Sequence, residues 1–283
     1  MNIFFQHPTA ISDALINQIT APLAGQTRRI SEQCVVLEHT IFDPALKAAL
    51  QQTALEKHID IAFLERQYQW SDFKLLAMDM DSTVINIECI DEIADMCGKK
   101  AEVSAITEAA MRGEITDFNH SLRLRLGILA GVDESVLERI LNERLQLNVG
   151  AEQLIQTAHA NGLQTLLVSG GFTFFTNALQ KRLNLTHVRA NQLEIIDGKI
   201  TGHVIGDIVN GQVKADTVRS YCDLLNVPTS AAICMGDGAN DLPMMNISGL
   251  SVAYHAKPRV QAQATVAINH MGLDGLIPIL TTT

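Results

Sequence analysis

Hydrophobic residues gather in short runs along this chain, and polar stretches separate the runs. From residue 73 onward the chain alternates helical patterns with four apolar runs, "FKLLAMD", "LQTLLVSGG", "AAICMGDG" and "LSVAY". Runs that are apolar throughout predict strands buried on both faces, because a solvent-facing side would carry polar residues at alternate positions. The pattern therefore predicts an α/β fold with a parallel sheet, whose functional residues should follow the carboxyl ends of the strands.

Two other stretches depart from this alternation. The pattern of residues 1–70 predicts a small α/β domain, with strands at 2–6, 34–40 and 59–65 and helices at 10–20 and 43–58. The polar junction "YQWSD" places the boundary near Trp70, so that the second domain covers residues 71–283. Residues 88–147 show helical patterns without a convincing strand. We expect them to form a helical cap, inserted after the first strand of the large sheet and overhanging its carboxyl edge.

The composition excludes several classes of protein. The 283 residues carry a formal net charge of −10 without a basic cluster, which argues against a nucleic-acid partner. The apolar runs are too short to span a bilayer, and the chain does not open with the pattern of a secretion signal. The five scattered cysteines lack CxxC spacing and are typical of reduced thiols. We therefore expect a cytoplasmic protein with no membrane partner.

Chemically active residues follow three of the predicted strands. They are Asp79 and Asp81 after the first strand, Ser169, Gly170 and Gly171 after the second, and "GDGAND" at 236–241 after the third. Each motif alone is a weak signal, since a DxD occurs by chance and SGG or GDG usually marks a turn. Paired carboxylates at the end of a buried strand lose hydration and repel one another, which predicts a cation beside them.

Taken together, these motifs resemble those of the haloacid-dehalogenase-type phosphatases. "DMDST", "VSGG", Lys214 and "GDGAND" match DxDx[TV], S/T, K and GDxxxD over about residues 73–280. Longer segments, including "DSTVINIECIDEIA" and "AMRGEITDFNHSLRLR", resemble the bacterial phosphoserine phosphatases. The resemblance implies a Rossmann-type parallel sheet of the haloacid-dehalogenase kind. It also implies hydrolysis of O-phospho-L-serine to L-serine and phosphate, the last step of serine biosynthesis, with Mg²⁺ as cofactor.

The resemblance implies a role for each carboxylate at this edge. Asp79 would be the nucleophile that forms an aspartyl-phosphate, and Asp81 would be the general acid and then the general base. Asp79, Asp237 and the backbone carbonyl of Asp81 would bind Mg²⁺, which prefers oxygen ligands. Asp241 would position a metal-bound water. Without a cation, such a cluster of carboxylates would be destabilised by several kcal/mol.

The phosphate group would be held by donors from other motifs. The resemblance assigns this role to Ser169, Gly170 and Lys214, with Asn240 nearby and Gly171 in support. A glycine lets its backbone N–H approach an anion closely, and the lysine adds a fixed positive charge.

The serine part of the substrate would need a cation for its carboxylate and an anion for its ammonium group. By motif match these are Arg125 and Glu88. Arg123 lies about 200° around the same helix from Arg125, so we expect it at the surface. Met111 and Phe118 would line the pocket, although packing in the core explains them nearly as well.

Several alternatives stay open from the sequence. The chain could act on another small amino-alcohol phosphate, as a phosphatase or a phosphotransferase. It could instead be a binding or regulatory protein that kept the fold, although the presence of Asp79, Asp81, Lys214 and Asp237 disfavours this. In longer relatives the N-terminal segment is often a ferredoxin-like regulatory module. Here residues 1–70 could bind serine, mediate a homodimer or only pack on the core.

Overall fold

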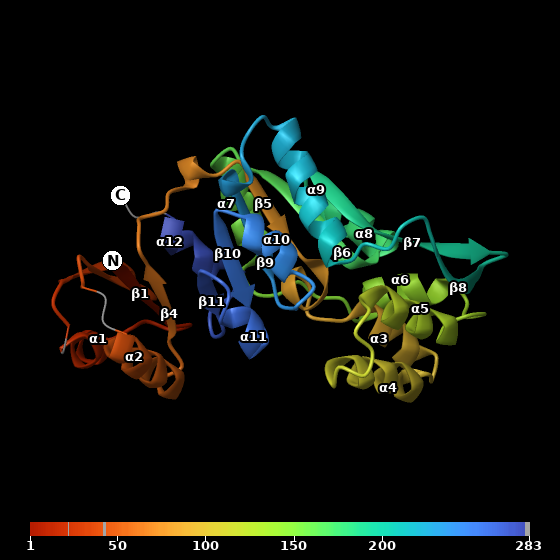
Figure 1. Ribbon diagram of the computed structural model, residues 1–283, viewed down its shortest axis with the longest axis horizontal. Helices are drawn as coiled ribbons and strands as arrows, with labels where there is room; N and C mark the ends of the chain where they lie inside the picture. The colour runs from red at the N-terminus through yellow and green to blue at the C-terminus, as the bar shows by residue number, and fades with distance from the viewer. Residues whose placement is uncertain (22, 42–43, 281–283) are drawn as a thin grey trace.

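The computed structural model describes residues 1–21, 23–41 and 44–280, and it contains a small sheet beside a large one (Figure 1). The small sheet is antiparallel, with strand order β2-β3-β1-β4. Two helices connect its strands in the order β-α-β-β-α-β, which is the ferredoxin-like plan. Its elements are β1 (Asn2–Gln6), α1 (Asp13–Thr20), β2 (Gln26–Ser31), β3 (Cys34–Glu38), α2 (Pro44–Glu56) and β4 (Asp60–Leu64).

Both faces of the small sheet are buried. Ile3 and Phe5 pack in a cluster with residues of α1 and α2, such as Ile16. Phe4, which lies between them on β1, belongs to a cluster that extends to Leu276 near the end of the chain. Because successive side chains of a strand point to opposite faces, the all-apolar core of "NIFFQ" follows from this double burial.

A buried carboxylate joins the small sheet to the C-terminal part of the chain. Asp60, at the start of β4, is 4% exposed. Its two oxygens accept hydrogen bonds from the backbone N–H groups of Asn269, His270 and Met271, at 2.7 to 3.2 Å. Gln6 adds a bond from Nε2 to the carbonyl of Gly275, at 2.6 Å. The small sheet is therefore packed directly against residues 269–275.

The large sheet has seven strands in the order β11-β10-β9-β5-β6-β7-β8. Every neighbouring pair is parallel except β7 with β8, which is antiparallel. The strands are β5 (Leu75–Met78), β6 (Gln164–Phe172), β7 (His187–Ile196), β8 (Lys199–Ile205), β9 (Ala232–Gly236), β10 (Leu250–Tyr254) and β11 (Val266–Ile268).

Helices cover both faces of this sheet, as the apolar runs predicted. Leu75 and Ala77 of β5 pack with residues of α9 and α10, whereas Leu76 and Met78 pack with residues of α7 and α8. The alternation of Cβ directions along a strand explains why four consecutive residues are all apolar. The helices are α7 (Ala151–Ala160), α8 (Thr173–Leu183), α9 (Gly211–Leu224), α10 (Leu242–Ile247), α11 (Pro258–Gln261) and α12 (Ile277–Leu280).

A helical segment is inserted between β5 and β6, and Figure 1 shows it gathered beyond one end of the large sheet. It consists of α3 (Cys89–Met96), α4 (Lys100–Met111), α5 (Phe118–Ile128) and α6 (Ser135–Glu143). Residues 88–147 hold no strand, only an isolated bridge from Leu147 back to Ile85 and one from Asp133 to Lys199. The expectation of a helical insertion after the first strand of the large sheet is therefore confirmed.

The structure also differs from the sequence-based expectation. β2, β7, β8 and β11 were not predicted, and β8 runs antiparallel at the edge of a sheet that was expected to be parallel. β2 and β8 lie at sheet edges, where one face meets solvent and polar residues interrupt the apolar pattern. The division into domains near Trp70 stays a prediction. Among the described residues, each helix is too short or too polar to cross a membrane.

Candidate active site

The loop that follows β5 carries the first pair of aspartates. Asp79 is 5% exposed, and its Oδ1 accepts a hydrogen bond from the backbone N–H of Met80 at 2.7 Å. The chain then forms a tight turn, η2 (Met80–Val84), in which Ser82 adopts the left-handed conformation with φ of 55°. This turn starts at the carboxyl end of a central strand, which is where open α/β sheets place their functional groups.

A fully buried lysine links Asp79 to the third motif. Asn210 caps the start of α9, since its Oδ1 accepts a hydrogen bond from the N–H of Val213 at 3.0 Å. The first turn of α9 carries Lys214, whose Nζ lies 2.7 Å from Asp79 Oδ1 and 2.7 Å from Asp241 Oδ1. Burial alone would lower the pKa of Lys214, but the two carboxylates raise it above its ordinary value. The lysine is therefore a permanent buried cation.

Three carboxylates surround a point beside this lysine. One oxygen from each of Asp79, Asp237 and Asp241 lies within 4.8 Å of the other two. Burial, and then the charge of Asp241, raise the pKa of Asp79 well above its ordinary value, and the same causes raise that of Asp237 to about 7. A divalent cation would offset this repulsion, and the donor set is all oxygen, as Mg²⁺ and Ca²⁺ prefer. These residues therefore fit a hard divalent cation.

Asp241 is the most restrained of the three carboxylates. Its Oδ1 contacts Lys214, and its Oδ2 accepts a hydrogen bond from the N–H of Gly238 at 2.9 Å. A Cβ added to Gly236 would lie 2.4 Å from the carboxyl carbon of Asp241, so only glycine leaves room for this side chain. Asp79 and Asp237 are consequently the carboxylates with more capacity to bind a metal, while Asp241 organises the loop.

Asp81 lies in the same turn, η2. Burial, followed by the charge of Glu88, raises the pKa of Asp81 to about 7. Its Oδ1 accepts a hydrogen bond from the N–H of Cys89 at 3.2 Å. A Cβ on Gly171 would lie 2.6 Å from Oδ2 of Asp81, which explains why a glycine stands at this position of β6. A half-buried carboxyl group that holds a proton near neutral pH is suited to general acid–base chemistry.

The last residues of β6 (Gln164–Phe172) present a hydroxyl and a backbone amide next to these aspartates. Ser169, Gly170 and Gly171 therefore lie within the strand, whereas the sequence analysis placed them after it. Ser169 is fully buried, and its Oγ accepts a hydrogen bond from the N–H of Gly171 at 2.8 Å, which leaves its own proton to donate. Asn191 Nδ2 donates to the carbonyl of Gly170 at 2.7 Å and so fixes the peptide plane. Asn240 lies on the neighbouring loop, where a Cβ on Gly238 would be 2.2 Å from its Oδ1.

Helix α5 of the cap contacts the end of β6 and the start of α9. The ring of Phe118 lies so close to Gly170 that an added Cβ would be 3.0 Å from its Cζ. Asn210 Nδ2 also donates to Asn119 Oδ1 at 3.1 Å, which ties the start of α5 to the start of α9. Phe118 thus packs against Gly170, and its role in lining a substrate pocket stays a prediction. Met111 ends α4, and its side chain lies outside what the structure describes.

Two charged residues of the cap segment interact electrostatically with Asp81, the exposed Glu88 and the partly buried Arg125. Ser82 Oγ donates a hydrogen bond to Glu88 Oε1 at 2.7 Å, an interaction that depends on the unusual backbone of Ser82. Arg125 is partly buried, and its Nε has no hydrogen-bond partner among the described residues. Burial lowers the pKa of Arg125, whereas the carboxylates of Asp91 and Glu88 raise it. Arg123 is exposed, as its position on the helix predicted.

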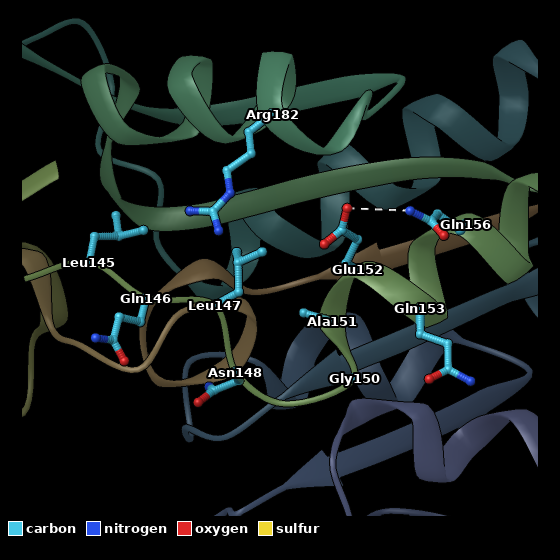
Figure 2. Close-up of a pocket in the computed structure, with 10 residues that line it drawn as sticks. All are labelled: Leu145, Gln146, Leu147, Asn148, Gly150, Ala151, Glu152, Gln153, Gln156 and Arg182. Atoms are coloured by element: carbon cyan, nitrogen blue, oxygen red, sulfur yellow. Dashed lines mark hydrogen bonds between the residues drawn. The ribbon is translucent and has the colours of Figure 1, made fainter. Parts of the chain in front are cut away.

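A separate cavity of about 600 Å³ lies along the segment that returns from the cap to α7 (Figure 2). None of the residues predicted for catalysis or binding lines it. Asn148, on its rim, donates from Nδ2 to the carbonyls of Thr83 and Ile85 at 2.8 and 3.1 Å. Asn148 therefore holds the loop that carries Asp79 and Asp81. The sequence analysis missed it, as it missed Ser82 and Asp91, because no motif spacing marks these contacts.

The fold and the site define a class of hydrolase. Residues 76–246 match the family model described as haloacid dehalogenase-like hydrolase, which is more than half of the chain. The chain therefore belongs to the haloacid dehalogenase-like hydrolases, and it is an enzyme of that family.

Individual relatives narrow this class. The chain is 51% identical over 235 residues to a phosphoserine phosphatase of Polaromonas sp., covering 82% of this chain and 100% of that protein. The crystal structure of a probable phosphoserine phosphatase from Vibrio cholerae, in unliganded form, superposes with a TM-score of 0.82 at 36% identity, covering 99% of this chain and 86% of that one. A haloacid-dehalogenase family hydrolase from Salmonella enterica serovar Typhi gives a TM-score of 0.87 at 31% identity, covering 99% of each chain.

Proposed function

We propose that this protein is a phosphoserine phosphatase, which hydrolyses O-phospho-L-serine to L-serine and phosphate. The observation that carries the proposal is the proximity of two groups of residues at the carboxyl end of β5. Asp79, Asp237 and Lys214 form a phosphoryl-transfer centre, and Glu88 and Arg125 lie beside it with opposite charges. The phosphoserine phosphatase of Polaromonas, matched over its full length, supports the same conclusion.

Asp79 is the nucleophile in this proposal. The contacts with Met80 N–H and Lys214 Nζ fix the orientation of its carboxylate. Attack of this carboxylate on phosphorus breaks the bond to the serine oxygen and gives an aspartyl-phosphate, which water then hydrolyses. Because phosphate monoesters are extremely slow to hydrolyse, most of the acceleration has to come from stabilising charge on the phosphoryl group. Lys214, Ser169 Oγ and Gly170 N–H are the donors that we assign to that task.

Asp81 moves the proton. With its pKa near 7, its carboxyl group donates a proton to the serine oxygen as that oxygen leaves phosphorus. The resulting carboxylate then accepts a proton from the water that attacks the aspartyl-phosphate. The bond from Cys89 N–H to Oδ1 and the space left by Gly171 hold the side chain toward the reacting atoms.

We propose Mg²⁺ as the cation held by Asp79, Asp237 and the backbone carbonyl of Asp81. When bound, it neutralises charge on the carboxylates and on the phosphoryl oxygens. Asp241, already bonded to Lys214 and Gly238, keeps the loop in place beside the cation.

The amino-acid part of the substrate distinguishes this enzyme from a general phosphatase. We assign the ammonium group of the substrate to Glu88 and its carboxylate to Arg125, whose planar guanidinium suits bidentate binding. Phe118, packed against Gly170, closes the pocket over the substrate. All five cysteines are free thiols, which supports our proposal that the enzyme acts in the reducing cytoplasm.

We also propose that residues 1–70 form a separate small domain that docks on the phosphatase domain at 71–283. The bonds from the backbone of 269–271 to Asp60, and the bond from Gln6 to Gly275, support a fixed rather than a tethered arrangement.

A phosphate-release assay tests the proposed function. The wild-type enzyme should release phosphate from O-phospho-L-serine with Mg²⁺ and not with a chelator, and Asp79→Asn should abolish turnover without changing the circular dichroism spectrum. Phosphoethanolamine, which lacks the carboxylate, should be a much poorer substrate. Equal rates on the two substrates would favour an enzyme for another amino-alcohol phosphate, and an active Asp79→Asn variant would refute the mechanism.

A further inference from the structure

Two buried polar atoms of the cap helices have no hydrogen-bond partner. They are Nε of Arg125 on α5 and Oδ1 of Asp91 in the first turn of α3. Only one other such side-chain atom occurs in the described part of the chain, Asp274 Oδ1, and it lies near Gly150. Burying a polar group without a partner is unfavourable, so these atoms indicate an interaction that is completed only in another state of the site.

Arg125 and Asp91 are matched in charge. Asp91 is the strongest electrostatic partner of the Arg125 guanidinium, ahead of Glu88 and Asp81. Arg125 is likewise the strongest favourable partner of the Asp91 carboxylate, ahead of Lys100. Nevertheless, among the described residues no ion pair or hydrogen bond joins the two side chains. The two charges therefore influence one another without a hydrogen bond or ion pair between them.

Glu88 does not fill the same role. Its Oε1 accepts the hydrogen bond from Ser82, so its carboxylate is held toward the turn that carries Asp79 and Asp81. Asp91 lies one helical turn further along the chain, on α3. A guanidinium has two edges, and a carboxylate at the Nε edge leaves the terminal fork free for a second carboxylate.

We propose that Asp91 is a positioning residue, which binds the Nε edge of Arg125 when substrate enters and thereby aims the terminal fork of the guanidinium at the substrate's carboxylate. The inference rests on the proposed function, because it assigns that carboxylate to Arg125. This hydrogen bond would give Arg125 Nε and Asp91 Oδ1 a partner at the same time. It also explains why an arginine is required, since a lysine offers no second edge.

The test compares two substrates on one variant. Asp91→Asn should lower kcat/KM for O-phospho-L-serine by roughly 10- to 100-fold, mainly through KM, because one charge-assisted hydrogen bond is lost. The kcat/KM for phosphoethanolamine should change less than about twofold, because that substrate has no carboxylate for Arg125 to bind. The ratio of kcat/KM for the two substrates does not depend on the fraction of the enzyme that is folded. The ratio can therefore be compared even if the variant is less stable than the wild type.

Three further variants sharpen the result. In an Arg125→Met background, Asp91→Asn should change kcat/KM for O-phospho-L-serine less than about twofold, since a residue that acts through Arg125 has no effect without it. Asp91→Glu keeps the charge and should retain most of the substrate preference. Glu102→Gln removes an exposed carboxylate from the first turn of α4 and should leave the preference unchanged.

Two outcomes would overturn the inference while leaving the proposed function intact. One is an equal loss for both substrates in Asp91→Asn, which would mean that Asp91 binds the ammonium group or only supports the fold. The other is a full additional loss in the Arg125→Met background. If the wild-type enzyme itself fails to hydrolyse O-phospho-L-serine, the proposed function fails first, and the two failures are therefore distinguishable.

Discussion

The buried ammonium of Lys214 offers the sharpest test of the electrostatics of the site. Replacing it with methionine keeps most of the side-chain volume and removes a charge that lies 2.7 Å from Asp79 Oδ1 and 2.7 Å from Asp241 Oδ1. At an effective dielectric constant of about 20, each contact corresponds to about 6 kcal/mol of Coulomb energy. Most of this is offset by the cost of removing three charged groups from water.

The net effect is the penalty for two carboxylates left without their cation. Breaking a buried ion pair by removing one partner costs about 3–5 kcal/mol. For a chain of this size, 1 kcal/mol shifts the melting temperature by roughly 2–4 °C. We therefore expect Lys214→Met to melt about 6–20 °C below the wild type, in chelator at pH 8, where the carboxylates are most fully ionised.

Thermal unfolding followed by circular dichroism measures the shift. Lys181→Met is the matched control, because Lys181 is an exposed lysine in the last turn of α8. It should melt within about 1 °C of the wild type, as surface substitutions usually do. If Lys214→Met melts as close to the wild type as the control does, Lys214 is not the buried counter-ion of these carboxylates, and our account of the site is wrong.

Two further predictions concern the metal site and the docking of the small sheet. In metal-free protein the pKa of Asp237 is raised from its ordinary value near 3.8 to about 7, so the native state binds more protons than the unfolded chain in that range and stability falls as pH rises through it. Mg²⁺ should therefore raise the melting temperature more at pH 7.5 than at pH 5.5. This difference between the two pH values should be smaller in Asp237→Asn. Equal increases at both pH values in the wild type would contradict the assignment of Asp237 as a metal ligand. Asp60→Asn replaces one acceptor oxygen by an N–H donor that faces backbone N–H groups. It should lower the free energy of unfolding by about 2–4 kcal/mol in urea titrations. Asp13→Asn, at an exposed carboxylate, is the control and should change the free energy of unfolding by less than about 1 kcal/mol. An Asp60→Asn variant as stable as the wild type would mean that this carboxylate contributes nothing to docking.

The sequence alone determined much of the central fold. The runs "FKLLAMD", "LQTLLVSGG", "AAICMGDG" and "LSVAY" all became strands of one sheet, because a strand buried on both faces has to be apolar at every position. Helix geometry also predicted that Arg123 and Arg125 lie on nearly opposite faces, and the resemblance of Arg125 to the family motif implied that Arg123 is the exposed one, as the structure shows. The grouping of polar motifs after strand ends predicted where Asp79 and Asp237 would meet. Their catalytic roles stay predictions.

Only the tertiary structure decided the rest. The edge strands β2 and β8 were invisible to the pattern, because a strand with one solvated face is defined by its pairing and not by its apolar content. The contacts of Asn148 with the loop at 82–85 and of Asp60 with 269–271, and the charge interaction between Asp91 and Arg125, join residues that are far apart in the chain. Periodicity reports on neighbours within one element, whereas such contacts depend on how elements pack, and packing is settled only when the whole chain folds.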